Sequence, residues 1–368
     1  MTVTQAGGPP AVSPSGALRV DVSLSPTGDP DQRQAAGAAE RVGYDGLWAG
    51  EITHDPFLML CLAAAATRRI ELGTSVALAL ARNPMTLAVT ANDLQQISGG
   101  RFRLGLGSQV KAHITRRFGM PWSQPAARMR EFVLAMRAIW DCWAGDDGPG
   151  HELNFRGDFY QLSLMPPQFV PRPHPFGPPP VLLAAVGTAM TETAAEVADG
   201  LLCHGFTTAR YLEEVTLPAL RRGRHGQLDG FDVVGHPMIV TGRSERAITA
   251  AAAEARTQIA FYASTPAYRP VLEVHGWGEL GEELHRLSRA GRWTEMPGLV
   301  DDTVLDAFAV TGEPQAVAAE LTRRYGRLFT RCVLHTSYDP GPDVLAEIAG
   351  GVKSGAGSPG DCPTRAGS

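Results

Sequence analysis

Residues 70–108 decide the fold, and they read IELGTSVALALARNPMTLAVTANDLQQISGGRFRLGLGS. Two apolar runs, Ile70–Val76 and Phe102–Ser108, lie at the ends of this stretch, and each contains glycine and closes near small polar residues. A run that is apolar throughout is typical of a buried parallel strand, and glycine marks places where the backbone approaches another group closely. We therefore predict two parallel strands whose C-terminal ends are open to a ligand.

A helix is predicted between these two strands. Asn83 is a suitable N-cap, and Pro84 then occupies the first helical position. The helix is expected to end at Ser98, because Gly99 and Gly100 follow it. The whole stretch is therefore a strand–helix–strand unit.

Further apolar runs continue the alternation of strands and helices along the chain. The eight predicted strands are Leu18–Ser25, Gly46–Glu51, Ile70–Val76, Phe102–Ser108, Val181–Val186, Gly200–Phe206, Phe231–Val240 and Arg331–Thr336. Such alternation favours a parallel sheet, and eight units suit an α/β protein with a (β/α)8 TIM barrel. A doubly wound open sheet is the competing architecture, but no GxGxxG fingerprint follows the first strand.

Two insertions interrupt this rhythm, and the two ends of the chain differ in composition from the rest. Residues 144–180 carry a hairpin-like piece and a proline-rich run after the fourth strand, and residues 263–303 carry aromatic and helical pieces after the seventh. Residues 1–16 and 351–368 are rich in Pro, Gly and Ser, which is typical of disordered tails. We predict one domain over residues 17–350.

The overall composition excludes several classes of protein. The net charge of −5 and the pI near 6.1 give no reason to expect a nucleic-acid or membrane partner. No apolar run reaches the length of a transmembrane helix, and the N-terminus lacks the pattern of a signal peptide. The five cysteines are odd in number and lack CxxC spacing, which argues against disulfides or structural zinc and for a reducing cytoplasm.

A barrel places its site at the carboxyl ends of its strands, and three polar side chains there are candidate catalytic residues. Glu51 ends the second strand, where a buried carboxylate can act as a general acid or base; the alternative is an acceptor that ties loops together. His204 interrupts the sixth strand, and a packed core histidine is its alternative. His113 follows the glycine-rich end of the fourth strand, and a helix-start hydrogen bond is its alternative.

The remaining candidates have ordinary structural interpretations. His54 and Asp55 are interpreted as a loop residue and a helix cap, with contact to the site as the alternative for each. Four aromatic residues of the second insertion are expected to pack locally, with an apolar substrate pocket as the alternative; they are Tyr262, Tyr268, Trp277 and Trp293. No HExxH or paired His/carboxylate spacing is present, so no metal is predicted, and no GxSxG motif indicates a serine hydrolase.

Six motifs, taken in order, carry a resemblance to a known family. They are GYDGLWAGE, DPFLMLCLAAAATRRIELGTSV, NP, SGGRFRLGLGS, LLAAVG and EVADGLL, and the resemblance covers about residues 18–336. Together they resemble the bacterial-luciferase-like oxidoreductases. Within that superfamily the chain is most similar to the branch that uses the deazaflavin coenzyme F420.

This resemblance implies a luciferase-like TIM barrel that binds the deazaflavin across the strand C-termini. It implies a non-prolyl cis peptide between Ser75 and Val76 behind the coenzyme ring, and a homodimer or higher homo-oligomer. The residues implied to bind the coenzyme are Thr74, Ser75, Val76, Gly107, Ser108, Gln109, Ala185, Val186, Gly187 and Thr188. Amides at glycines and at a helix N-terminus are suited to the coenzyme's phosphate.

Three positions depart from the sugar-phosphate dehydrogenases of this branch. Those enzymes carry Asp-His where this chain has Glu51-Ile52, a glutamate that aligns with Val110, and a lysine that falls near Thr207. We therefore expect a small organic substrate that is less charged than a phosphosugar. The predicted activity is hydride transfer between coenzyme F420 and this substrate. The alternatives are an FMN-dependent monooxygenase on the same barrel and a non-catalytic binding barrel.

Overall fold

The computed structural model of the chain describes residues 17–24, 31–144, 151–334 and 336–355. They fall into two compact units. The N-terminal unit consists of Asp21–His204 and Glu214–Val234; the C-terminal unit consists of Met1–Val20, Gly205–Glu213 and Gly235–Ser368, as far as these are described. The predicted tail 1–16 lies outside the described residues, as do residues 356–368 of the other tail. The single domain over 17–350 stays a prediction.

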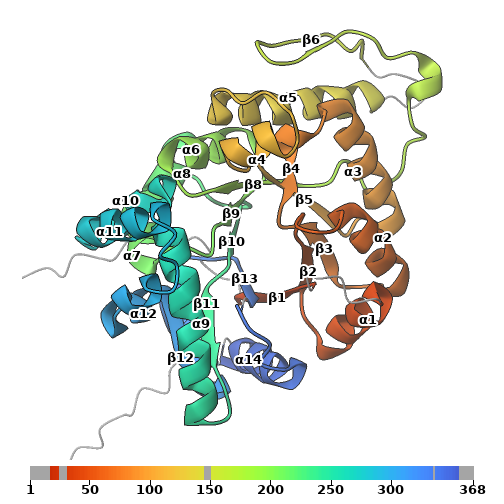
Figure 1. The fold of residues 1–368 in the computed structure, drawn as a ribbon. Helices are drawn as coiled ribbons and strands as arrows, with labels where there is room; N and C mark the ends of the chain where they lie inside the picture. Colours follow the sequence, from red (N-terminus) through yellow and green to blue (C-terminus); the bar gives the residue numbers. More distant parts are fainter. Residues whose placement is uncertain (1–16, 25–30, 145–150, 335, 356–368) are drawn as a thin grey trace, which may run out of the picture. The chain divides into compact units, whose positions relative to one another are not determined.

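Parallel strands form the centre of the N-terminal unit (Figure 1). Their bounds are β1 (Arg19–Ser23), β2 (Gly46–Ala49), β3 (Glu71–Thr74), β4 (Ala77–Leu78), β5 (Phe102–Gly107), β8 (Val181–Ala185), β9 (Gly200–Cys203) and β10 (Asp232–Gly235). The parallel pairs are β1–β2, β2–β3, β3–β5, β4–β5, β5–β8, β8–β9 and β9–β10. Most of their residues are buried, as their apolar runs predicted.

Helices follow these strands and pack in sequence on one another, as α1–α2, α2–α3, α3–α5, α5–α6 and α6–α8 (Figure 1). Their bounds are α1 (Gln32–Val42), α2 (Pro56–Ala66), α3 (Pro84–Ser98), α4 (Lys111–Arg116), α5 (Pro125–Trp143), α6 (Thr188–Val197) and α8 (Leu217–Gly223). The predicted ends of α3 are confirmed. The Met85 amide donates to the Asn83 side chain at 2.8 Å, and Gly99 has a left-handed φ of 68°.

The C-terminal unit contains a two-stranded parallel sheet, one further strand and several helices. Its strands are β11 (Met238–Thr241), β12 (Ala309–Gly312) and β13 (Arg331–Leu334), of which β11 pairs with β12. Its helices are α7 (Ala209–Tyr211), α9 (Glu245–Ala263), α10 (Arg269–Glu273), α11 (Gly278–Arg289), α12 (Asp302–Phe308), α13 (Pro314–Tyr325) and α14 (Pro342–Gly355).

Several predicted boundaries were wrong. The third predicted strand is split, because β3 ends at Thr74 and β4 begins at Ala77. The seventh is also split, into β10 and β11, since Pro237 between them has no N–H for a strand ladder. Strand β12 and helix α14 were not predicted. Helix α14 runs to Gly355, so residues 351–355, expected in a disordered tail, are helical.

The two insertions have the character that the sequence indicated. In the first, β6 (Phe155–Arg156) and β7 (Gln161–Leu162) form an antiparallel hairpin; residues 145–150 lie outside the described part. In the second, aromatic rings pack together. The ring of Phe206 lies 6.0 Å from that of Tyr262 and 5.8 Å from that of Tyr268, centroid to centroid. These contacts fit the local-packing interpretation of the aromatic residues.

Candidate active site

The carboxyl ends of β3, β5, β8 and β9 lie side by side in the N-terminal unit. In the parallel register Leu106 of β5 is opposite Leu183 of β8, and Ala185 of β8 is opposite Cys203 of β9. The segments Gly107–Gln109 and Val186–Thr188, which directly follow β5 and β8, therefore leave the sheet as neighbours. The residues predicted to bind a coenzyme are thus brought to one edge of one sheet.

The Thr74 side chain hydrogen-bonds β3 to β5 and is therefore not available to bind a ligand. Its hydroxyl donates to the Gly105 carbonyl at 2.7 Å and accepts from the Gly105 amide at 2.9 Å. A Cβ at Gly105 would lie 1.9 Å from the Thr74 carbonyl oxygen, so only glycine allows this approach. Thr74 is fully buried. Its place in the site is therefore structural.

The peptide bond between Ser75 and Val76 is cis, as the resemblance implied. Both residues are half-buried. The Glu51 amide donates to the Val76 carbonyl at 3.2 Å, and the Ser75 amide donates to the Ala49 carbonyl at 2.8 Å. The Val76 side chain occupies the space beside Gly107, where a Cβ would meet its Cγ2 at 2.6 Å. The end of β5 is therefore shaped around this segment.

After β5 the chain turns sharply into α4. Gln109 has a left-handed φ of 58°, which is uncommon for a residue other than glycine. Its side-chain oxygen accepts from the Val110 amide at 2.9 Å, and the Ser108 hydroxyl donates to the Gln109 carbonyl at 3.2 Å. These local bonds hold the turn in shape and leave Ser108 and Gln109 half-buried at the sheet edge.

After β8 the chain enters α6 with no side-chain cap. Gly187 is the N-cap residue, and it provides no side-chain hydrogen bond to the first turn. A Cβ at Gly187 would meet nothing within 4 Å, and Thr188 and Ala189 are exposed. The first amides of a helix point outward and carry a partial positive charge. This end of α6 can therefore accept an anionic group.

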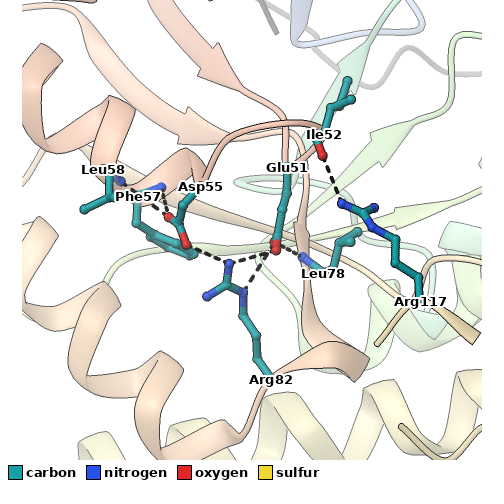
Figure 2. A network of polar contacts seen from close by, with 8 residues as sticks. All are labelled: Glu51, Ile52, Asp55, Phe57, Leu58, Leu78, Arg82 and Arg117. Atoms are coloured by element: carbon teal, nitrogen blue, oxygen red, sulfur yellow. Dashed lines mark hydrogen bonds and ion pairs between the residues drawn. The ribbon is translucent and has the colours of Figure 1, made fainter. Parts of the chain in front are cut away.

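Glu51 and Arg82 form the centre of a polar network at the end of β2 (Figure 2). One carboxylate oxygen of Glu51 accepts from Arg82 Nη2 at 2.9 Å; the other accepts from the Leu78 amide at 2.8 Å and from Arg82 Nε at 3.3 Å. Arg82 Nη2 also donates to Asp55 at 3.0 Å, while Asp55 caps α2 through the Phe57 amide at 2.8 Å. Glu51 thus acts as the acceptor that ties loops together.

Arg82 itself is half-buried and keeps its charge. Burial by itself would lower the pKa of the Arg82 guanidinium, but the hydrogen bonds to Glu51 and Asp55 and their charges outweigh burial, so the pKa is raised. The guanidinium also lies over the Phe57 ring, 5.2 Å from its centroid. Arg82 was not singled out in the sequence. The only signal was one charged residue in the apolar run ALALARNP.

The two histidines lie in different surroundings. His204 directly follows β9 and is half-buried, whereas His113 on α4 is exposed, and its backbone carbonyl accepts from the Arg117 amide at 3.0 Å. Next to His204, burial raises the pKa of the Cys203 thiol to about 12, so this thiol is no thiolate nucleophile at neutral pH. His54 is exposed. The catalytic roles of His204 and His113 stay predictions.

The rest of the described chain adds no metal centre to these strand ends, and its one described cavity lies elsewhere. Within the described ranges, no cluster of three or more His, Cys, Asp or Glu side chains could hold a metal ion. A cavity of about 750 Å³ lies within the C-terminal unit, among residues that include Thr241, Ser244, Ala251 and Tyr338. It contains none of the predicted site residues.

Comparisons with known proteins agree with this arrangement. The family model described as luciferase-like monooxygenase matches residues 19–331. An uncharacterized protein of Mycobacterium tuberculosis is 53% identical over 293 residues, which cover 79% of this chain and 85% of that protein. The 5,10-methylenetetrahydromethanopterin reductase of Archaeoglobus fulgidus is 29% identical over 326 residues, 85% of this chain and 91% of the reductase.

A solved structure shows the same fold. The coenzyme F420 dependent tetrahydromethanopterin reductase from Methanopyrus kandleri superimposes with a TM-score of 0.73 at 23% identity, over 91% of this chain and 98% of that one. The fold is therefore the (β/α)8 TIM barrel that the sequence predicted, with insertions after the fourth and seventh strands. The chain belongs to the luciferase-like monooxygenase family, and it is an oxidoreductase of that superfamily.

Proposed function

We propose that this protein transfers a hydride between coenzyme F420 and a small organic substrate. The observation that carries the proposal is the uncapped, glycine-started N-terminus of α6 beside the glycine-ended strand β5. Coenzyme F420 and FMN both carry a phosphate and a flat tricyclic ring. Relatives that act with F420, such as the Methanopyrus reductase, support F420 rather than FMN as the coenzyme.

The chain's own residues would bind and orient this coenzyme. The amides of Gly187 and Thr188 would hold its phosphate, because they open a helix with no competing side-chain cap. The Ser75–Val76 segment and the backbone of Gly107–Gln109 would face its ring. When bound, the coenzyme supplies the hydride chemistry, and the protein supplies position and electrostatics.

Glu51 would then be a positioning residue. Its carboxylate holds Arg82 and the Leu78 amide, and its own amide holds the Val76 carbonyl. It would keep the Ser75–Val76 segment in place behind the coenzyme.

A titration tests the proposed function directly. We expect oxidised F420 to bind the purified protein, measured by its own fluorescence, and reduced F420 to bind as well, measured by quenching of the protein's tryptophan fluorescence; FMN should bind more weakly. The alternative is an FMN-dependent monooxygenase, which the family name itself favours. Tight FMN binding with no measurable F420 affinity would establish that alternative. Binding of F420 with no turnover in a substrate screen would favour the non-catalytic barrel.

The variant Gly187→Val tests where the phosphate lies. Gly187 has a φ of −79°, which valine adopts freely, and the added side chain meets no protein atom within 4 Å. We expect unchanged thermal stability and F420 binding weakened by about tenfold or more, since the side chain would displace the phosphate. Gly298→Val is the matched control, because Gly298 also has open space around it. Equal binding by both variants would contradict this phosphate site.

We further propose a homodimer in a cytoplasmic setting. Helix α2 is apolar on all sides, and Leu58 is 71% exposed on it; Ile97 on the neighbouring α3 is 53% exposed. A second copy of the chain is the partner that would cover these side chains. Light scattering that shows a monomer would contradict the dimer.

The cytoplasmic setting is supported by the cysteines. Cys61, Cys142, Cys203 and Cys332 are free thiols, which is typical of a reducing compartment. No helix of the described ranges is long and apolar enough to span a membrane.

A further inference from the structure

The cavity of about 750 Å³ in the C-terminal unit is not used by the proposed function. Its walls come from three segments, which are residues 241–244 at the end of β11, one face of α9, and residues 338–344 at the start of α14 (Figure 1). Small-molecule sites have volumes of this order, with mostly apolar walls and a few polar groups. The cavity is therefore large enough for a ligand of its own.

Tyr338 joins two of these walls. Its hydroxyl accepts from the Thr241 amide at 2.6 Å and donates to the Thr241 carbonyl at 2.8 Å. In the same loop Asp339 accepts from the Gly341 amide at 2.9 Å, and Gly341 has a left-handed φ of 87°. The end of β11 and the loop before α14 are thus held together by hydrogen bonds, and the cavity is already formed without a ligand.

The side chain of Thr241 is a buried polar group that lacks a partner. Thr241 lines the cavity and is 1% exposed, and its Oγ1 has no hydrogen-bond partner among the described residues. A buried hydroxyl that is removed from water gains nothing in return unless another group bonds to it. A polar group on a ligand in the cavity would supply that bond.

Small apolar residues form much of the remaining wall. They are Ala247, Ala250, Ala251, Pro340, Pro342 and Val344. The three alanines are spaced by three or four residues, so they share one face of α9. A ligand that fits this wall has an apolar body.

The charged side chains of the cavity favour a cation. Glu254, Asp339 and Asp343 are exposed carboxylates of its wall, and Arg243 is the one cationic side chain among its lining residues. Arg243 pairs with Glu347 at 2.8 Å, so its charge is already balanced. Within the described ranges no acidic cluster could hold a metal ion. The carboxylates therefore suit an organic cation better than a metal ion.

The N-termini of α9 and α14 do not reverse this preference. Together they contribute about one unit of positive partial charge, which is less than the charge of the three carboxylates. Each helix also has an acidic residue in its first turn, Glu245 in α9 and Asp343 in α14. The electrostatic potential in the cavity is therefore expected to be negative.

We propose that this cavity binds a small organic cation, a protonated amine with an apolar body. The body would contact the alanine face of α9. The ammonium group has three N–H donors, so it can donate to the Thr241 hydroxyl and to a carboxylate at the same time. The inference does not depend on the proposed function.

Three probes with the same indole body and different charges test the proposal. They are tryptamine, a cation, tryptophol, which is neutral, and indole-3-acetate, an anion, each titrated into the full chain by calorimetry. We expect tryptamine to bind about tenfold or more tightly than the other two at low salt, and its affinity to fall as salt rises. Equal affinities, tighter binding of indole-3-acetate, or no binding of tryptamine at about 10 mM would overturn the proposal.

Two alanine variants of α9 locate the binding site. A250W places an indole ring in the cavity, whereas A253W changes an alanine of the same helix that does not line it. Both alanines are exposed, so both variants should fold with similar melting temperatures. We expect tryptamine binding to be lost in A250W and kept in A253W. Equal binding by the two variants would overturn the proposal.

A pair of charge variants tests the carboxylates. E254Q/D343N removes two charges from the cavity, and the control E279Q/D306N removes two from exposed residues of the same unit outside it. Asp343 and Glu279 each lie in the first turn of a helix, which matches their effects on helix stability. We expect tryptamine to bind about tenfold more weakly to the test variant than to the control at low salt. Equal affinities would overturn the proposal.

The variant Thr241→Val tests the unpartnered hydroxyl. Valine has the shape of threonine without the hydroxyl, so the melting temperature should not fall, and tryptamine affinity should fall by about threefold or more. A lower melting temperature would show that the hydroxyl is already bonded within the fold. That result, or unchanged tryptamine affinity, would overturn the contact between the amine and Thr241.

Discussion

Two arginines act on the same loop, Glu51-Ile52, in opposite ways (Figure 2). Arg82 is half-buried between the carboxylates of Glu51 and Asp55, at 2.9 and 3.0 Å. Arg117 is exposed and donates only to the Ile52 carbonyl, at 3.1 Å. A charge that is half-buried must be neutralised, whereas an exposed charge remains solvated at little cost. The first arginine therefore stabilises the fold through two ion pairs, and the second contributes only an exposed hydrogen bond to the same loop.

The largest effect on stability is expected from breaking the Arg82 network. Arg82→Met leaves Glu51 with a carboxylate that is only 13% exposed and has lost its counter-charge. We expect a loss of about 2 kcal/mol in the free energy of unfolding, measured by urea titration. Arg222→Met is the control, because Arg222 pairs with Glu192 while 58% exposed, and we expect less than about 0.5 kcal/mol there. Equal losses in Arg82→Met and Arg222→Met would contradict the larger stabilising role of the half-buried arginine.

The variant Glu51→Gln distinguishes a positioning role of Glu51 from a role in acid–base catalysis. Glutamine still accepts from the Leu78 amide but no longer neutralises Arg82, so we expect a loss of about 1 kcal/mol in the free energy of unfolding. For a positioning role, coenzyme affinity should fall together with turnover. Unchanged F420 affinity with turnover reduced by about 100-fold or more would instead support general acid–base catalysis. Glu51→Asp, which keeps the charge, should preserve stability better than the amide.

The ion cluster around Glu320 has the opposite ratio of charges to the Arg82 network, because one carboxylate lies between two arginines. Glu320 lies between Arg323 and Arg324, and the hydrogen bonds from Arg323, then those from Arg324, lower its pKa from 4.5 to about 2. A lowered pKa stabilises the fold above pH 4.5, and this contribution is lost as the pH falls toward 2. Since the arginines are partly solvated, we expect Glu320→Gln to cost about 1 kcal/mol at neutral pH. Urea titrations from pH 7 to pH 3 should show the difference from wild type shrinking.

The smallest effect on stability is expected at Arg116, an exposed residue of α4. Arg116→Gln removes an exposed charge that has no carboxylate partner in the described chain, so the free energy of unfolding should change by less than about 0.3 kcal/mol. Thermal and urea unfolding both measure this. A loss close to that of Arg82→Met would mean that Arg116 has a structural role.

Local features of this fold were predictable, and long-range contacts were not. Asn83 and Asp55 cap helices through amides two residues away, so their own sequence neighbourhood reveals them. Arg82 and Glu51 are 31 residues apart, and no spacing rule links them. The split between β3 and β4 was missed for a similar reason, because the segment between them bonds to β2 and its following loop.

The sequence by itself determined the alternation of strands and helices, the helix ends and the glycine-marked strand ends, because backbone propensity and hydrophobic burial act over a few residues. The fold class followed from these, and the family from six motifs that resemble it. Only the tertiary structure decided which charges are neutralised. It paired Glu51 with Arg82, used the Thr74 hydroxyl to fasten β5, and left Lys111, Arg116 and Arg117 without carboxylate partners among the described residues. Ion pairing depends on distance in space, and residues far apart in sequence become neighbours only when the strands align.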